Sequence, residues 1–185
     1  MNPSPLPSLA EIIQRHGLAA KKSLGQHFLL SEAITERIVR YASALAGVNA
    51  IEIGPGPGGL TRALLRSEAR HVYVVEKDDR AIAIMHELAE AFPGRLTILH
   101  EDALAVDLLA RVPAPRKIIA NLPYNIGTQL LLNWLEQIYS LSHRGRDGVG
   151  ASMREPSHSA PLLASPLQGE ECKLSHQFFI IRRLQ

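Results

Sequence analysis

The sequence predicts an α/β fold in which a parallel sheet carries helices on both faces. Segments with the period of strands alternate with segments with the period of helices from residue 50 to residue 138. The predicted strands are short, nearly continuous apolar runs rich in β-branched residues, which is typical of strands buried on both faces. Directly after the first strand, the segment 54–59 contains four glycines and two prolines. Ligands of such sheets bind at this kind of strand-to-helix turn.

Two helices and a loop precede the sheet. Ser8 and Glu11 have the spacing of a capping box at the start of a short helix, which Gly17 ends. Residues 21–30 are loop-like and contain two lysines and an aromatic residue. A second helix is predicted over residues 31–47, with Ser at its first position as the cap and an apolar face turned to the core.

From residue 50 onward, strands and helices alternate. The strands are predicted over residues 50–53, 71–76, 96–99 and 117–121. The helices are predicted over residues 60–65, 78–92, 104–109 and 128–138, with Thr128 as the cap of the last one. Beyond residue 140 no period is visible, and the Ser-, Pro- and Leu-rich composition is typical of disorder. Within this tail only residues 177–182 again have the composition of a strand.

We therefore divide the chain into three parts. Residues 1–17 form an N-terminal extension with a short helix, residues 18–139 form an incomplete ligand-binding α/β domain, and residues 140–185 form a divergent tail. The net charge of +2 permits a nucleic-acid partner without indicating one. A single cysteine, Cys172, excludes an internal disulfide, and the eight histidines show no metal-ligand spacing. Without a signal peptide or an apolar membrane span, we expect a cytoplasmic monomer with no metal and no membrane contact.

The glycine-rich turn indicates a nucleoside-containing cofactor. Gly54, Gly56 and Gly59 match the pattern G-x-G-x-x-G, although a tight turn without any ligand would explain them as well. Glu76 ends the second strand, where an acidic side chain accepts both ribose hydroxyls of a bound nucleoside; a solvated acid at a strand end is the alternative. At this point the cofactor is either NAD or S-adenosylmethionine.

Two later segments distinguish these cofactors. Asp102, after the third strand, would accept a hydrogen bond from an adenine amino group, or would cap a helix that begins at Leu104. After the fourth strand, the tetrapeptide that begins at Asn121 suits methylation of an exocyclic amine. The Asn121 oxygen and a carbonyl held by Pro123 would accept hydrogen bonds from the amine, and Tyr124 would stack on the base. A proline turn with the tyrosine in the core is the alternative.

Taken together, these motifs resemble a known family: the ribosomal small-subunit RNA adenine N6,N6-dimethyltransferases, which are related to the erythromycin-resistance methylases and to mitochondrial transcription factor B. The matching segments lie between residues 18 and 139 and are Lys22-Ser-Leu-Gly-Gln-His-Phe-Leu29, Glu52-Ile-Gly-Pro-Gly-Pro-Gly-Gly-Leu-Thr61, Glu76, Asp102-Ala-Leu104 and Asn121-Leu-Pro-Tyr-Asn-Ile126. The resemblance implies a Rossmann-like S-adenosylmethionine-dependent methyltransferase fold for residues 18–139.

The resemblance also implies a role for each matching residue. His27 and Leu29 would close over the methionine part of S-adenosylmethionine, Glu76 would hold the ribose, and Asn121 would contact cofactor and target together. The remaining cofactor contacts would come from Gly54, Gly56, Lys77, Asp102 and Ala103. Phosphate contacts to RNA would come from Lys21 and Lys22.

The implied reaction transfers two methyl groups to N6 of each of two adjacent adenosines, in a hairpin near the 3′ end of small-subunit (16S) rRNA within the ribosomal subunit. Members of the family continue the sheet with further strands and add a small helical domain, and neither is recognisable after about Tyr139. The fourth strand would then be an exposed apolar edge, which residues 177–182 would cover by pairing with it. We expect the cofactor half of the site to be complete and RNA dimethylation to be impaired or lost.

Two other functions remain compatible with the residues. An NAD-dependent oxidoreductase would use the same glycines but would leave residues 121–124 without a role. A non-catalytic RNA-binding or ribosome-assembly protein would keep the fold without turnover.

Overall fold

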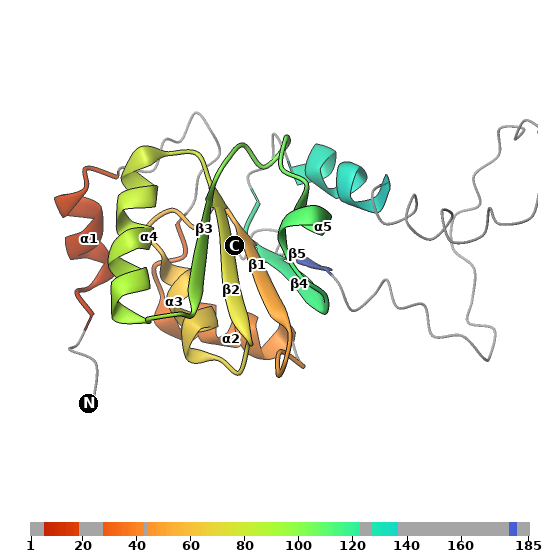
Figure 1. Cartoon of the computed structure of the whole chain (residues 1–185). Helices are drawn as coiled ribbons and strands as arrows, with labels where there is room; N and C mark the ends of the chain where they lie inside the picture. Colours follow the sequence, from red (N-terminus) through yellow and green to blue (C-terminus); the bar gives the residue numbers. More distant parts are fainter. Residues whose placement is uncertain (1–5, 19–27, 43, 123–126, 137–177, 181–185) are drawn as a thin grey trace, which may run out of the picture.

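The computed structural model shows a five-stranded, all-parallel sheet with the strand order β3-β2-β1-β4-β5 (Figure 1). The structure describes residues 6–18, 28–42, 44–122, 127–136 and 178–180. The strands are β1 (Asn49–Ile53), β2 (His71–Glu76), β3 (Leu96–His100), β4 (Arg116–Ala120) and β5 (Phe178–Ile180). The predicted α/β class is confirmed, and four strands lie within one residue of their predicted bounds.

Helices cover both faces of this sheet. On one face lie α1 (Leu9–Arg15), α2 (Glu32–Ala42), α3 (Gly59–Arg66) and α4 (Asp79–Ala91), and on the other lie α5 (Leu108–Arg111) and a helix over residues 127–136 (Figure 1). Alternate strand residues point to opposite faces of the sheet. Ala50 therefore packs in the first helical layer, with α1–α4, and Ile51 packs in the second helical layer, with α5 and the helix over residues 127–136. The two layers bury the strands on both sides, as their continuous apolar composition predicts.

The outer strand β5 comes from the tail. It pairs with β4 in parallel register, with Ile118 opposite Phe178 and Ala120 opposite Ile180. The prediction that residues 177–182 cover this edge is confirmed for residues 178–180, and β4 is therefore not an exposed edge of the sheet. Burying the backbone groups of an apolar strand in a ladder satisfies their hydrogen bonds and removes a site for aggregation.

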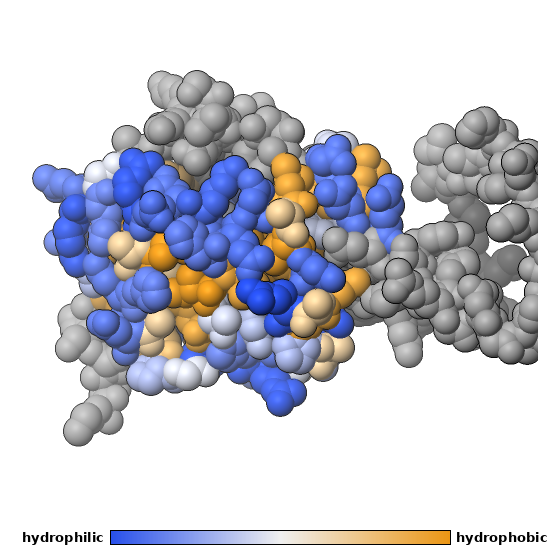
Figure 2. Space-filling model, turned by 45° about the horizontal axis from the view of Figure 1, so that its top comes forward, coloured by the Kyte–Doolittle hydropathy of each residue, from blue (hydrophilic) through white to orange (hydrophobic). Residues whose placement is uncertain are grey.

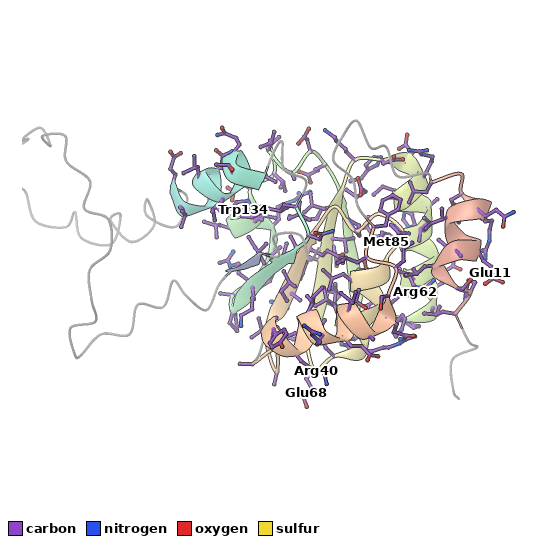
Figure 3. All side chains as sticks on the ribbon, turned by 180° about the vertical axis from the view of Figure 1, so that it is seen from behind. Glu11, Arg40, Arg62, Glu68, Met85 and Trp134 are labelled. Carbon is purple, nitrogen blue, oxygen red and sulfur yellow. The ribbon has the colours of Figure 1, made fainter. Side chains whose placement is uncertain are left out.

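The N-terminal segment is fastened to α3 and α4. Ser8 and Glu11 form the predicted capping box of α1. The buried guanidinium of Arg62 donates to the carbonyl oxygen of Pro7 at 2.7 Å, and Arg80 donates to that of Gly17 at 2.9 Å. Figure 3 shows Glu11 and Arg62 at the same side of the molecule. These contacts hold the segment from Pro7 to Gly17 against α3 and α4.

Two predicted helix starts are wrong. Helix α5 begins at Leu108 and not at residue 104, because Asp107 accepts hydrogen bonds from the N–H groups of Leu109 and Ala110 and so caps a later start. Thr128 lies inside the helix over residues 127–136. A cap has non-helical backbone, so Thr128 is not the cap. Residues 137 and 138, which end the predicted helix, lie outside the described residues.

Candidate functional site

The predicted site residues lie after the carboxyl ends of four neighbouring strands. Gly54 follows β1, Glu76 ends β2, Asp102 follows β3 and Asn121 follows β4. Because all of these strands are parallel, their carboxyl ends meet at one edge of the sheet. The chain passes from β1 to β2 and β3 on one side and returns to β4 on the other, so β1 and β4 flank the point where the strand order reverses. In open α/β sheets, this point is where ligands bind.

The turn after β1 needs glycine for its backbone conformation. Gly54, Gly56 and Gly58 have φ angles of 67°, 53° and 84°, a region that side chains disfavour. The N–H of Gly54 donates to the carbonyl oxygen of Val75 at 2.9 Å, which ties the turn to β2. A Cβ placed on Gly54 would meet no atom within 4 Å. Gly54 therefore has open space above it, where a ligand can approach the backbone closely.

The other glycines of the turn are packed against protein atoms. A Cβ on Gly56 would lie 3.1 Å from the ring of Phe28, and one on Gly59 would lie 2.2 Å from the carbonyl oxygen of Leu29. The packing of residues 28–29 on the turn therefore requires small residues at both positions. Leu29 is partly buried against the α1–α4 layer, which places this predicted cofactor residue beside the turn. His27 lies outside the described residues, together with Lys21 and Lys22.

Glu76 bends back over the loop that follows β2. Its Oε1 accepts hydrogen bonds from the N–H groups of Lys77 at 2.8 Å and Asp78 at 3.0 Å. Among the described residues, its Oε2 has no hydrogen-bond donor. The carboxylate is thus held in one orientation by the backbone and keeps acceptor capacity for a ligand.

Lys77 joins the ends of β2 and β3. Its Nζ lies 3.1 Å from Oδ2 of Asp102, and Oδ1 of Asp102 accepts the N–H of Leu104 at 2.9 Å. The hydrogen bond from Leu104, followed by the one from Lys77, lowers the pKa of Asp102 below its ordinary value. Asp102 is therefore ionised at neutral pH and acts only as an acceptor. Ala103 is partly buried against the second helical layer. Lys77, which is exposed, positions Asp102.

The most buried acid at this edge, Glu52, was not among the predicted site residues. It lies in the central strand with 3% of its surface exposed, and Oγ1 of Thr61 donates to its Oε2 at 2.7 Å. Burial raises the pKa of Glu52 to about 8; the hydrogen bond from Thr61 acts against this, and the charge of Glu76 adds to it. An acidic residue inside an otherwise apolar strand was the signal in the sequence that could have identified it.

Only part of the fourth predicted segment is described. Asn121 and Leu122 are partly buried, and Leu122 packs on the second helical layer. Pro123 and Tyr124 lie outside the described residues, so their predicted roles stay predictions. Figure 2 shows apolar side chains, framed by hydrophilic ones, on the face that is seen when the top of Figure 1 is turned forward.

The chemistry of this edge fits a cationic nucleoside. The carboxylates of Glu76 and Asp102 end or follow neighbouring strands, and the space over Gly54 is open. A pyrophosphate would meet unfavourable charge here, whereas a ligand with positive charge would be attracted. In the described part of the chain, no three His, Cys, Asp or Glu residues are grouped as metal ligands. Nor does that part contain a helix with the length and apolarity to cross a bilayer.

The sequence of this chain is similar to those of known proteins. A sequence model described as ribosomal RNA adenine dimethylase matches residues 17–175. "Ribosomal RNA small subunit methyltransferase A" of Paramagnetospirillum magneticum is 60% identical over 132 residues, which cover 71% of this chain and 47% of that protein. The protein of the same name from Paracoccus denitrificans is 56% identical over 130 residues, which cover 70% of this chain and 46% of that protein. The chain spans about half the length of the curated relatives it matches.

The fold of this chain is also similar to that of a solved structure. The crystal structure of a dimethyladenosine transferase from Plasmodium falciparum superposes with a TM-score of 0.51 at 26% identity. The match covers 60% of this chain and 38% of that one.

Proposed function

The chain belongs to the ribosomal RNA adenine dimethylase family, and on this basis we propose that it takes part in methylating N6 of two adjacent adenosines in a hairpin near the 3′ end of small-subunit rRNA. The cofactor of this family is S-adenosylmethionine. The observation that carries the proposal is the convergence of Gly54, Glu76, Asp102 and Asn121 on one edge of the sheet. The family favours S-adenosylmethionine over NAD, and so do the carboxyl groups at this edge.

Each described site residue has a part in holding the cofactor. Glu76, fixed by two backbone N–H groups, accepts the ribose hydroxyls with its remaining oxygen. Asp102, ionised and held by Lys77, accepts the amino group of the adenine. Gly54 lets the amino-acid part approach the backbone, because no side chain fills that space. Leu29, with His27, covers this part from the N-terminal side.

For methyl transfer, the protein mainly has to position the target amine. The bound cofactor supplies an electrophilic methyl group on a sulfonium. The lone pair of an adenine N6 is delocalised into the ring and is a poor nucleophile. Asn121 at the end of β4 accepts a hydrogen bond from the amine and favours a pyramidal nitrogen, with the carbonyl next to Pro123 as the second acceptor. Tyr124 stacks on the base, and Lys21 and Lys22 contact RNA phosphates.

Calorimetric titration of the purified chain with S-adenosylmethionine and with NAD tests the cofactor assignment. We expect S-adenosylmethionine to bind and NAD not to bind. Glu76→Gln should weaken the binding of S-adenosylmethionine about tenfold or more, because a hydrogen bond to a charged group is lost. Glu90→Gln, an exposed change on α4, is the matched control and should bind like the wild type. Binding of NAD alone, or equal binding by both glutamine variants, would refute the assignment.

Transfer of tritiated methyl groups to undermethylated small subunits tests the reaction. The product of this reaction is N6,N6-dimethyladenosine in digested small-subunit rRNA, and we expect little of it, because the further strands of the family's sheet are not recognisable after about Tyr139. Binding of S-adenosylmethionine without any methyl transfer would support the non-catalytic RNA-binding alternative instead.

A further inference from the structure

Glu52 is a buried titratable group that the proposed mechanism does not use. Its carboxyl lies on the central strand β1, 3% exposed, and is hydrogen-bonded to Thr61 of α3 at 2.7 Å. The hydroxyl of Thr61 also lies 3.8 Å from the sulfur of Met85 on α4, which is labelled in Figure 3. Apart from Thr61, the surroundings on this side are apolar. Among the described residues, no cation is paired with the carboxyl of Glu52 to compensate a negative charge there.

The charged groups on the neighbouring elements do not favour an ionised Glu52. From β2, the charge of Glu76 disfavours the ionisation of Glu52. Nη1 of Arg62 on α3 donates to the carbonyl oxygen of Pro7, while its buried Nε and Nη2 have no hydrogen-bond partner among the described residues. Lys117 of β4 donates to the carbonyl oxygen of Ala42 at 2.7 Å. At the start of α4, Arg80 is paired with Asp78 at 2.6 Å. Among the described residues, none of the hydrogen bonds or ion pairs of these cations involves Glu52, so the carboxyl keeps its proton in the free protein.

The carboxyl is nevertheless close to the ligand edge. Glu52 precedes Gly54 by two positions, and its register partner on β2 is Val74, two positions before Glu76. The open space over Gly54 therefore lies at the end of the strand that carries the buried acid. A positive charge placed there would supply the compensation that the described residues do not provide.

We propose that Glu52 couples cofactor binding to the release of a proton: its carboxyl is neutral in the free protein and ionises when S-adenosylmethionine brings positive charge to the Gly54 edge. This inference rests on the proposed function. The proton leaves the carboxyl for the buffer, and the carboxylate that remains stabilises the cation. Glu52 is thus a positioning residue whose charge appears only when the site is filled.

Two consequences follow for the affinity. Near pH 7 the binding of one S-adenosylmethionine should release close to one proton from Glu52. The apparent affinity should rise up to about tenfold per pH unit below pH ~8 and level off above it, since the acid is then already ionised. The α-amino group of the ligand titrates in the same range, but it contributes equally to any variant.

Calorimetric titration with S-adenosylmethionine in phosphate and in Tris, from pH 6 to pH 9, counts the protons released. We expect the wild type to release about one proton more at pH 7 than Glu52→Gln, and Glu68→Gln to match the wild type. Glu68 is exposed and lies at the opposite end of the sheet (Figure 3). S-adenosylhomocysteine, which lacks the sulfonium charge, should release fewer protons from the wild type.

A second measurement needs no variant. The infrared difference spectrum of the wild type should lose a protonated-carboxyl band when S-adenosylmethionine is added. Binding with no such loss and with equal proton release by wild type and Glu52→Gln would overturn the inference while leaving the proposed function intact. Failure of the wild type to bind S-adenosylmethionine at all would overturn both.

Discussion

Replacing Glu52 by glutamine should change how the stability of the protein depends on pH. In the folded protein burial raises the pKa of Glu52 from 4.5 to about 8. The folded state therefore holds a proton on this carboxyl in a pH range where the unfolded state has lost it. Stability due to this proton is fully present below pH 4.5 and is lost as the pH rises through about 8. Glutamine has the same shape and does not titrate, so Glu52→Gln avoids the loss.

The size of the effect follows from the two pKa values. A difference of about 3.5 pKa units corresponds to about 5 kcal/mol when the pH lies above both values. Between pH 5 and pH 9 the loss of stability amounts to about 4 kcal/mol. This is a large part of the 5 to 15 kcal/mol that is typical of a domain.

Urea unfolding of wild type and Glu52→Gln at several pH values from 5 to 9 measures this loss. The free energy of unfolding of the variant minus that of the wild type should increase by about 4 kcal/mol over this range. Every other titrating group is present in both proteins, so the difference isolates Glu52. A difference that stays constant with pH would refute the burial argument. Glu68→Gln should follow the wild-type curve.

Two further predictions concern packing. Gly59→Ala should destabilise the protein by about 1–3 kcal/mol or more in urea unfolding, because the new Cβ would lie 2.2 Å from the carbonyl oxygen of Leu29; an unchanged midpoint would contradict this packing of residues 28–29 on the turn. Deleting residues 175–185 should lower the thermal midpoint and the solubility, because it removes β5 and exposes the backbone groups of β4. Unchanged solubility and thermal stability would show that the β4–β5 pairing is unimportant.

Much of the fold could be predicted because its signals are local. Each strand was visible as a short apolar run, and the capping box of Ser8 and Glu11 lies within a few residues. One error, the start of α5, arose where two local signals competed. Asp102 and Asp107 are both residues that commonly cap helices. Only the packing of Val106 and Leu108 in the core selects Asp107 as the cap of α5. Neither buried position can be recognised from its neighbours in sequence.

Some features of the candidate site could likewise be predicted from the sequence, and others could not. The polar residues at the ends of the second, third and fourth strands, Glu76, Asp102 and Asn121, were predictable as site residues, since parallel strands bring their carboxyl ends together. The hydrogen bond of Lys77 to Asp102, the packing of Leu29 on Gly59 and the isolation of Glu52 were not predictable. These contacts join residues far apart in the chain.

The sequence by itself determined the α/β class, the glycine-rich turn and the family, because periodicity and motif spacing are properties of the chain alone. Only the tertiary structure decided which acid is buried, which glycines face protein atoms and which one faces open space. It also decided that residues 178–180 complete the sheet beside β4. Burial and electrostatics depend on what surrounds a group in space, and those surroundings exist only once the layers have packed.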